Sequence, residues 1–72
     1  SVPLIKFTKN ESEEIKTPIV NLKSFIEQSR VAFITGEKSI DNDWDSYVKT
    51  LNDLGMANVI KIHQDAYDRV YK

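Results

Sequence analysis

The sequence predicts an all-α chain of about three helices, and three observations lead to this fold class. Apolar residues recur at steps of three and four in three separate stretches, which is the period of an amphipathic helix. The only two glycines, Gly36 and Gly55, fall where helical patterns end, and glycine readily adopts the left-handed conformation that terminates helices. A capping motif precedes the first stretch. We therefore expect a single helical domain over residues 1–72.

Residues 1–7 are interpreted as an extended lead-in, because they are apolar, include Pro3 and are too few for an independent element. Thr8 and Glu11 then have the spacing of a capping box. In this motif the Thr8 hydroxyl accepts from the Glu11 backbone N–H, and the Glu11 carboxylate accepts from the Thr8 N–H. Phe7 precedes the cap and is placed for a hydrophobic staple.

The first helix is expected to end near Thr35. Its apolar face is formed by Ile15, Ile19, Leu22, Phe25, Ile26 and Phe33. The apolar face is weak just before Phe33, where either Ser29 or Arg30 has to lie on it. Pro18 interrupts the stretch, because proline lacks a backbone N–H and crowds the preceding turn. Two outcomes stay open: a kink at Pro18, or a split in which Thr17 and Pro18 begin a new helix.

Residues 37–40 are interpreted as a loop that leads into the second helix. Asp41 and Asp43 offer capping side chains, and their charge complements the positive end of the helix dipole. The apolar stripe of this helix consists of Trp44, Tyr47, Val48, Leu51 and Leu54. A last helix from about Ala57 to the end has its stripe at Val59, Ile60, His63, Ala66, Tyr67, Val70 and Tyr71. Two short amphipathic helices joined at Gly55 predict an αα-hairpin.

Composition limits the classes of function. A 72-residue chain buries only roughly 60% of the surface that its unfolded form exposes, so its stability is expected to be marginal. With no cysteine and one histidine, helix packing or neighbouring parts of a larger protein must supply the stability. Ten basic residues stand against 11 acidic ones, and the net charge of −1 argues against nucleic acid as a partner. No apolar run approaches the ~20 residues that cross a bilayer.

Three aspartates resemble the start of a calcium-binding loop. Asp41, Asp43 and Asp45 occupy its first, third and fifth positions. The loop also requires glycine at the sixth position and a bidentate glutamate at the twelfth. This chain has Ser46 and Asn52 at those positions. The start of a helix is therefore the better interpretation, and no calcium site is predicted.

Catalytic equipment is not apparent in the sequence. His63 is the only residue whose ordinary pKa lies near neutrality, and it falls on the apolar stripe of the last helix, where a packing role is expected. No cysteine or second histidine is present to share a metal, and no nucleophile elbow occurs. We predict no enzyme activity, no catalytic residue, no cofactor and no metal.

The aromatic residues are also candidates for ligand platforms, because aromatic faces stack on sugars and bases. Trp44, Tyr47, Tyr67 and Tyr71 all lie on helical stripes, where packing is the usual role. The substrate-binding residues are therefore unknown from the sequence. Trp44 and Tyr47 are kept as candidates, with core packing preferred.

Three motifs carry a resemblance to a known family. They are FITGEK over 33–38, DWDSYVK over 43–49 and QDAYDR over 64–69. This pattern resembles the C-terminal end of family 1 extracellular solute-binding proteins, and more narrowly the larger lipoproteins of Gram-positive carbohydrate importers and their alginate-binding relatives. The resemblance covers nearly the whole chain and is most specific from Phe33 to Arg69. His63 departs from the pattern, because relatives often have an aromatic residue there.

The resemblance implies a parent protein with two α/β lobes that close over a solute. This chain would supply terminal helices packed on one lobe, and the parent would deliver a carbohydrate or oligosaccharide to the permease subunits of an ABC importer. The location implied is extracytoplasmic, as a cell-surface lipoprotein or a periplasmic protein. The carbohydrate would bind only to the full-length protein, and no ligand contact is transferred to this segment.

An alternative comes from the residues alone: a free-standing helical module that binds a protein partner through an apolar groove. A further expectation follows if the chain is a part of a larger protein. Apolar surface would then be left bare, and the isolated chain could form a homodimer or pair residues 3–7 with a second copy.

Overall fold

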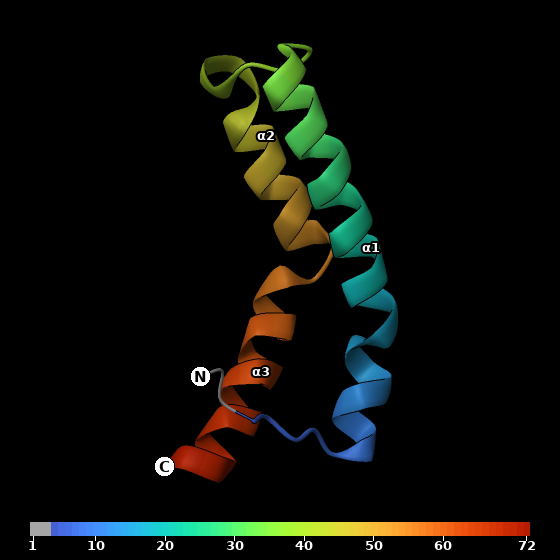
Figure 1. Ribbon diagram of the computed structural model, residues 1–72, viewed down its shortest axis with the longest axis vertical. Helices are drawn as coiled ribbons and strands as arrows, with labels where there is room; N and C mark the ends of the chain where they lie inside the picture. Colours follow the sequence, from blue (N-terminus) through green and yellow to red (C-terminus); the bar gives the residue numbers. More distant parts are fainter. Residues whose placement is uncertain (1–3) are drawn as a thin grey trace.

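The computed structural model describes residues 4–72, which form three α-helices and no strand (Figure 1). Helix α1 spans Lys9–Thr35, α2 spans Ile40–Asp53 and α3 spans Met56–Tyr71. The predicted all-α chain of about three helices is confirmed. Residues 1–3 of the expected lead-in, which include Pro3, lie outside the described residues.

Helix α1 runs the length of the molecule, with α2 beside its C-terminal part and α3 toward its N-terminal part (Figure 1). A helix of 27 residues is about 40 Å long. That length matches the longest dimension of the molecule, 41 Å. The long helix can therefore contact both short helices, which follow one another end to end. We call the α1–α3 contact the base and the α1–α2 contact the arm.

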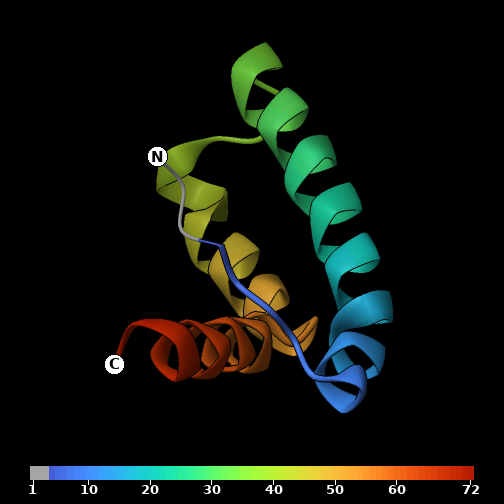
Figure 2. The same ribbon diagram turned by 60° about the horizontal axis from the view of Figure 1, so that its bottom comes forward.

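The hairpin differs from the one expected at Gly55. The antiparallel neighbours are α1 and α2, which are joined by residues 36–39, whereas α2 and α3 meet at a corner and change direction there (Figure 2). Gly55 forms the corner with φ 96°, in the left-handed region, and is the N-cap of α3. A Cβ atom on Gly55 would stand 4.0 Å from the Cβ of Pro18, so the corner rests on the middle of α1.

Pro18 lies inside α1, which continues through it as one helix. The split at Thr17 and Pro18 is therefore excluded. Figure 1 shows α1 curving around the two shorter helices. Such curvature is expected where proline removes one intrahelical hydrogen bond and its ring crowds the preceding turn.

The predicted capping box is present at the start of α1. The Thr8 hydroxyl accepts from the Glu11 N–H at 3.1 Å, and the Glu11 carboxylate accepts from the Thr8 N–H at 2.9 Å. At the other end, Gly36 adopts φ 82° and terminates the helix. Phe7 packs across to α3, where its ring meets the ring of His63 edge-on with centroids 5.0 Å apart.

The start of α2 corrects one expectation. The N-cap is Ser39, whose hydroxyl accepts from the Asn42 N–H at 3.1 Å, and the helix already includes Ile40. Asp43 accepts from the Ser39 N–H at 2.9 Å, and Asp41 lies beside it in the first turn. Ser39 takes the cap because its short side chain reaches the free N–H groups from just outside the helix. The acidic residues reinforce the cap from within.

Buried side chains concentrate in the base. The central cluster joins Ile15 and Leu22 of α1 to Val59 and Ile62 of α3. Partly buried apolar side chains surround it, namely Phe7, Ile19, Leu51, Leu54 and Met56. In the arm, α1 contributes buried Ser29 and Ala32, so Ser29 rather than Arg30 shares the apolar face. Helix α2 has no buried residue.

Candidate functional site

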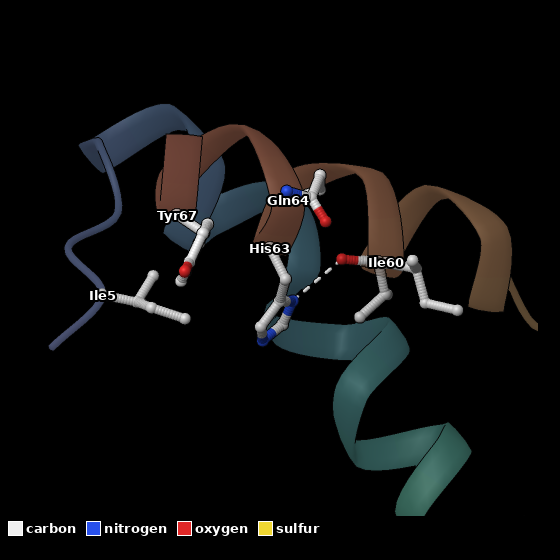
Figure 3. A pocket seen from close by; sticks show the side chains of 6 residues that line it. Ile5, Ile60, His63, Gln64 and Tyr67 are labelled. Carbon is white, nitrogen blue, oxygen red and sulfur yellow. Dashed lines mark hydrogen bonds between the residues drawn. The ribbon is translucent and has the colours of Figure 1, made fainter. Parts of the chain in front are cut away.

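A groove of about 420 Å³ lies on the base. It is lined by Ile5, Val59, Ile60, His63, Gln64 and Tyr67. Figure 3 shows Ile5, from the segment before α1, reaching toward Tyr67 and His63 of α3. The lining is largely apolar, with Gln64, the imidazole and the phenol as polar groups. This chemistry suits an apolar side chain better than a charged ligand.

His63 is held in place within this groove. Its Nδ1 lies 2.8 Å from the carbonyl oxygen of Val59, one turn earlier in α3 (Figure 3). A carbonyl can only accept, so Nδ1 carries the proton of this hydrogen bond, and in the neutral ring Nε2 keeps the lone pair. The ring also packs against Phe7. His63 thus lies half-buried where the sequence placed it for packing.

The segment before α1 is fastened to the end of α3 by two side chains. The Tyr71 hydroxyl accepts from the Leu4 N–H at 2.8 Å and donates to the Leu4 carbonyl at 3.4 Å. Arg69 donates to the Lys6 carbonyl at 3.0 Å. The motif that contains Arg69 was identified in the sequence, but its contact with Lys6 was not. These residues are 63 positions apart, and no local pattern connects them.

Arg69 also forms an ion pair that joins the start of α1 to the end of α3. Its guanidinium donates to both oxygens of the Glu11 carboxylate, one at 2.9 Å. The hydrogen bonds from Arg69 and then from the Thr8 backbone lower the pKa of Glu11 from 4.5 to about 2. In return, the hydrogen bond to Glu11 raises the pKa of Arg69. One carboxylate therefore caps α1 and anchors α3.

A second hollow, of about 320 Å³, lies on the arm, and we call it the aromatic hollow. It is lined by Ile26, Arg30, Phe33, Ile34, Ile40, Trp44 and Tyr47. It brings together the two sequence candidates, whose ring centroids are 5.2 Å apart. Tyr47 also meets Phe33 edge-on at 5.6 Å and stacks on Phe25 at 5.5 Å. Trp44 remains 45% exposed, so it packs at a boundary rather than in a core.

The remaining sequence candidates lie in regular structure. Asp41, Asp43 and Asp45 belong to α2, where Asp43 completes the cap. Across residues 4–72, no three histidine, cysteine, aspartate or glutamate residues gather in a group that could hold a metal ion. Over the same residues, none of the helices combines the length and the apolar character needed to cross a membrane.

Comparison with known proteins adds no relative. No family model matches the sequence, and searches of curated proteins and of solved structures give no significant match.

Proposed function

We propose that this chain forms the C-terminal helical part of an extracellular solute-binding protein that serves an ABC importer for carbohydrates or oligosaccharides. In that parent the chain has a structural, non-catalytic role, and its helices pack on one lobe. Two lines of reasoning support the proposal. One is the sequence resemblance, most specific from Phe33 to Arg69, and the other is the apolar face that α2 leaves uncovered.

The uncovered face is the observation that carries the proposal. Helix α2 has a clear apolar stripe and yet no buried side chain. Around the aromatic hollow, Ile34 is 71% exposed, Ile40 59% and Trp44 45%. Monomeric soluble proteins rarely expose large contiguous apolar patches, and such patches usually mark contact surfaces. A lobe that covers this face explains why an amphipathic helix lies unburied.

Partners and location belong to the same proposal. The direct partner is the remainder of the parent protein, and the permease subunits are reached through that parent. The carbohydrate binds between the lobes of the full-length protein only. The parent is extracytoplasmic, as a cell-surface lipoprotein or a periplasmic protein. Nucleic acid is not a partner in this scheme, because the charges of the chain nearly balance.

A pair of variants tests whether a lobe covers the arm. Ile34→Lys places a charge beside the aromatic hollow, and Val20→Lys is the matched control at another α1 position that is 63% exposed. Both variants should leave the isolated chain nearly unchanged, because surface substitutions usually alter stability by less than about 0.5 kcal/mol. In the full-length parent only Ile34→Lys should lower the Tm. Equal Tm values for the two parent variants would refute coverage of this face.

Two further measurements address transport directly. The upstream reading frame should encode several hundred residues of α/β pattern and a lipoprotein signal, as the resemblance implies. Titration calorimetry of the isolated 72 residues with a panel of oligosaccharides should show no binding, because the cleft of such proteins lies between two lobes. Tight sugar binding by the isolated chain would contradict the proposal.

The second candidate function is a free-standing helical module for protein interaction. The same aromatic hollow favours it, because a cavity of about 320 Å³ lined by Trp44, Tyr47 and Ile40 suits an apolar side chain of a partner helix. An upstream reading frame without an α/β protein would select this alternative.

A further inference from the structure

The four residues before the α1 cap alternate in burial. Ile5 and Phe7 are half-buried against α3, whereas Leu4 and Lys6 are exposed. Figure 2 shows this segment drawn out as it passes toward α1. Side chains of a β-strand point to opposite faces with a period of two. The segment therefore has the side-chain pattern of a short strand that lies on a helix.

Hydrogen bonds of the same segment alternate as well. The groups that are bonded belong to Leu4, through its N–H and carbonyl, and to Lys6, through its carbonyl. In an extended chain the N–H and carbonyl groups of residues i and i+2 point to the same edge. Tyr71 and Arg69 thus occupy one edge of the segment, in the position that a neighbouring strand would take.

The other edge of the segment is open. Within residues 4–72, the backbone N–H and carbonyl groups of Ile5 and Phe7 form no hydrogen bond. An unpaired strand edge is a template for pairing with another strand. The groove of about 420 Å³ also lies beside Ile5. Strand addition uses both features, because backbone hydrogen bonds give affinity and a side-chain pocket gives specificity.

From this arrangement we infer that segment 4–7 acts as an edge strand in the parent protein, where its open edge pairs with a β-strand from the preceding part of that protein. This inference rests on the proposed function. The partner strand bonds to Ile5 and Phe7 and places an apolar side chain in the groove. A strand of the same polypeptide is favoured as the occupant because two residues offer few hydrogen bonds. So few bonds poorly offset the cost of associating a separate molecule, whereas a covalently linked strand is present at high effective concentration.

Amide hydrogen exchange, followed residue by residue, tests the inference on the isolated chain and on the full-length parent. The Ile5 and Phe7 amides should exchange rapidly in the isolated chain and at least about tenfold more slowly in the parent, because a hydrogen-bonded amide exchanges only on opening. In the parent, Ile5→Pro should abolish the protection of Phe7, since proline removes a backbone donor from the open edge. Ile5→Ala keeps that donor and is the matched control, so protection of Phe7 should persist.

Each other outcome overturns the inference in a recognisable way. Rapid exchange of both amides in a parent that binds carbohydrate would refute the strand pairing and leave the proposed function standing. Protection that appears in the isolated chain and grows with its concentration would assign the edge to a second copy. A reading frame without an α/β body would refute the proposed function, and the inferred strand pairing with it.

Discussion

The base and the arm are built by the same helix but hold together differently. In the base, α1 and α3 both contribute buried side chains, including Leu22 and Ile62. In the arm, only α1 does, through the small residues Ser29 and Ala32, whereas α2 contributes half-exposed aromatic rings that pack on Phe25 and Phe33. An amphipathic pattern therefore does not guarantee burial. A helix can have a clear apolar face and still lack enough partner surface to cover it.

The largest expected effect is a core truncation in the base. Leu22→Ala should destabilise the chain by about 2–5 kcal/mol, because Leu22 is 4% exposed and its removal leaves a cavity. Val48→Ala in the arm should cost no more than about 1 kcal/mol, because Val48 is 37% exposed. Urea unfolding followed by far-UV circular dichroism measures both. If the first variant fails to fold, Ile62→Val should still cost about 0.5–1.5 kcal/mol. Equal losses of stability for the Leu22 and Val48 variants would show that the base and the arm are equally well packed.

Trp44 gives a sharper measure of the arm. A buried tryptophan typically costs about 3–5 kcal/mol when it is replaced by alanine. Because Trp44 is nearly half exposed, Trp44→Ala should cost about 2 kcal/mol or less. The same urea experiment measures it. A loss in the full range of a buried tryptophan would mean that the arm is as well packed as the base.

The corner between the two regions can be tested with a matched pair of glycines. Gly55 has φ 96° and Gly36 has φ 82°, and nothing lies within 4 Å of a Cβ at Gly36. Alanine at either position should cost about 1–2 kcal/mol from backbone strain alone. A Cβ at Gly55 would meet Pro18 only at ordinary contact distance. A much larger loss for Gly55→Ala than for Gly36→Ala would show that the corner tolerates no added contact.

The smallest expected effect is a pH dependence that comes from Glu11 in the base. The pKa of Glu11 is lowered from 4.5 to about 2, so this residue contributes stability above pH 4.5 that is lost as the pH falls toward 2. Thermal unfolding between these values should show a falling Tm. Glu11→Gln should lower the Tm near neutral pH and flatten its fall in acid. A slope unchanged by the substitution would assign the acid sensitivity to other carboxylates.

Local features of the fold could be predicted because the residues that form them are close in sequence. Thr8 and Glu11 are three positions apart, and the capping box requires only a helix start. Gly36 and Gly55 end helices because of their own backbone freedom. The cap of α2 was misplaced because the sequence offered several suitable residues in succession. Ser39 forms the cap because of its geometry at the start of the helix, and the sequence alone does not contain that geometry.

Tertiary features could be predicted less well. The contact between Arg69 and Glu11 joins residues 58 positions apart, and the direction of α3 after Gly55 depends on how the corner meets Pro18. Of the candidate residues, Trp44 and Tyr47 were placed correctly on one apolar stripe. Their half-exposed position could not be predicted, because periodicity defines a face and not the amount of surface that covers it.

The position of the single tryptophan has an optical consequence. Trp44 belongs to the arm and lies close to Tyr47 and Phe33, whereas no tryptophan lies in the base. Its fluorescence emission therefore reports on the arm alone, while the circular dichroism signal averages over all three helices. Coincident melting curves from the two probes would mean that both regions unfold as one cooperative unit. An earlier shift in emission would show the arm opening while the base remains folded.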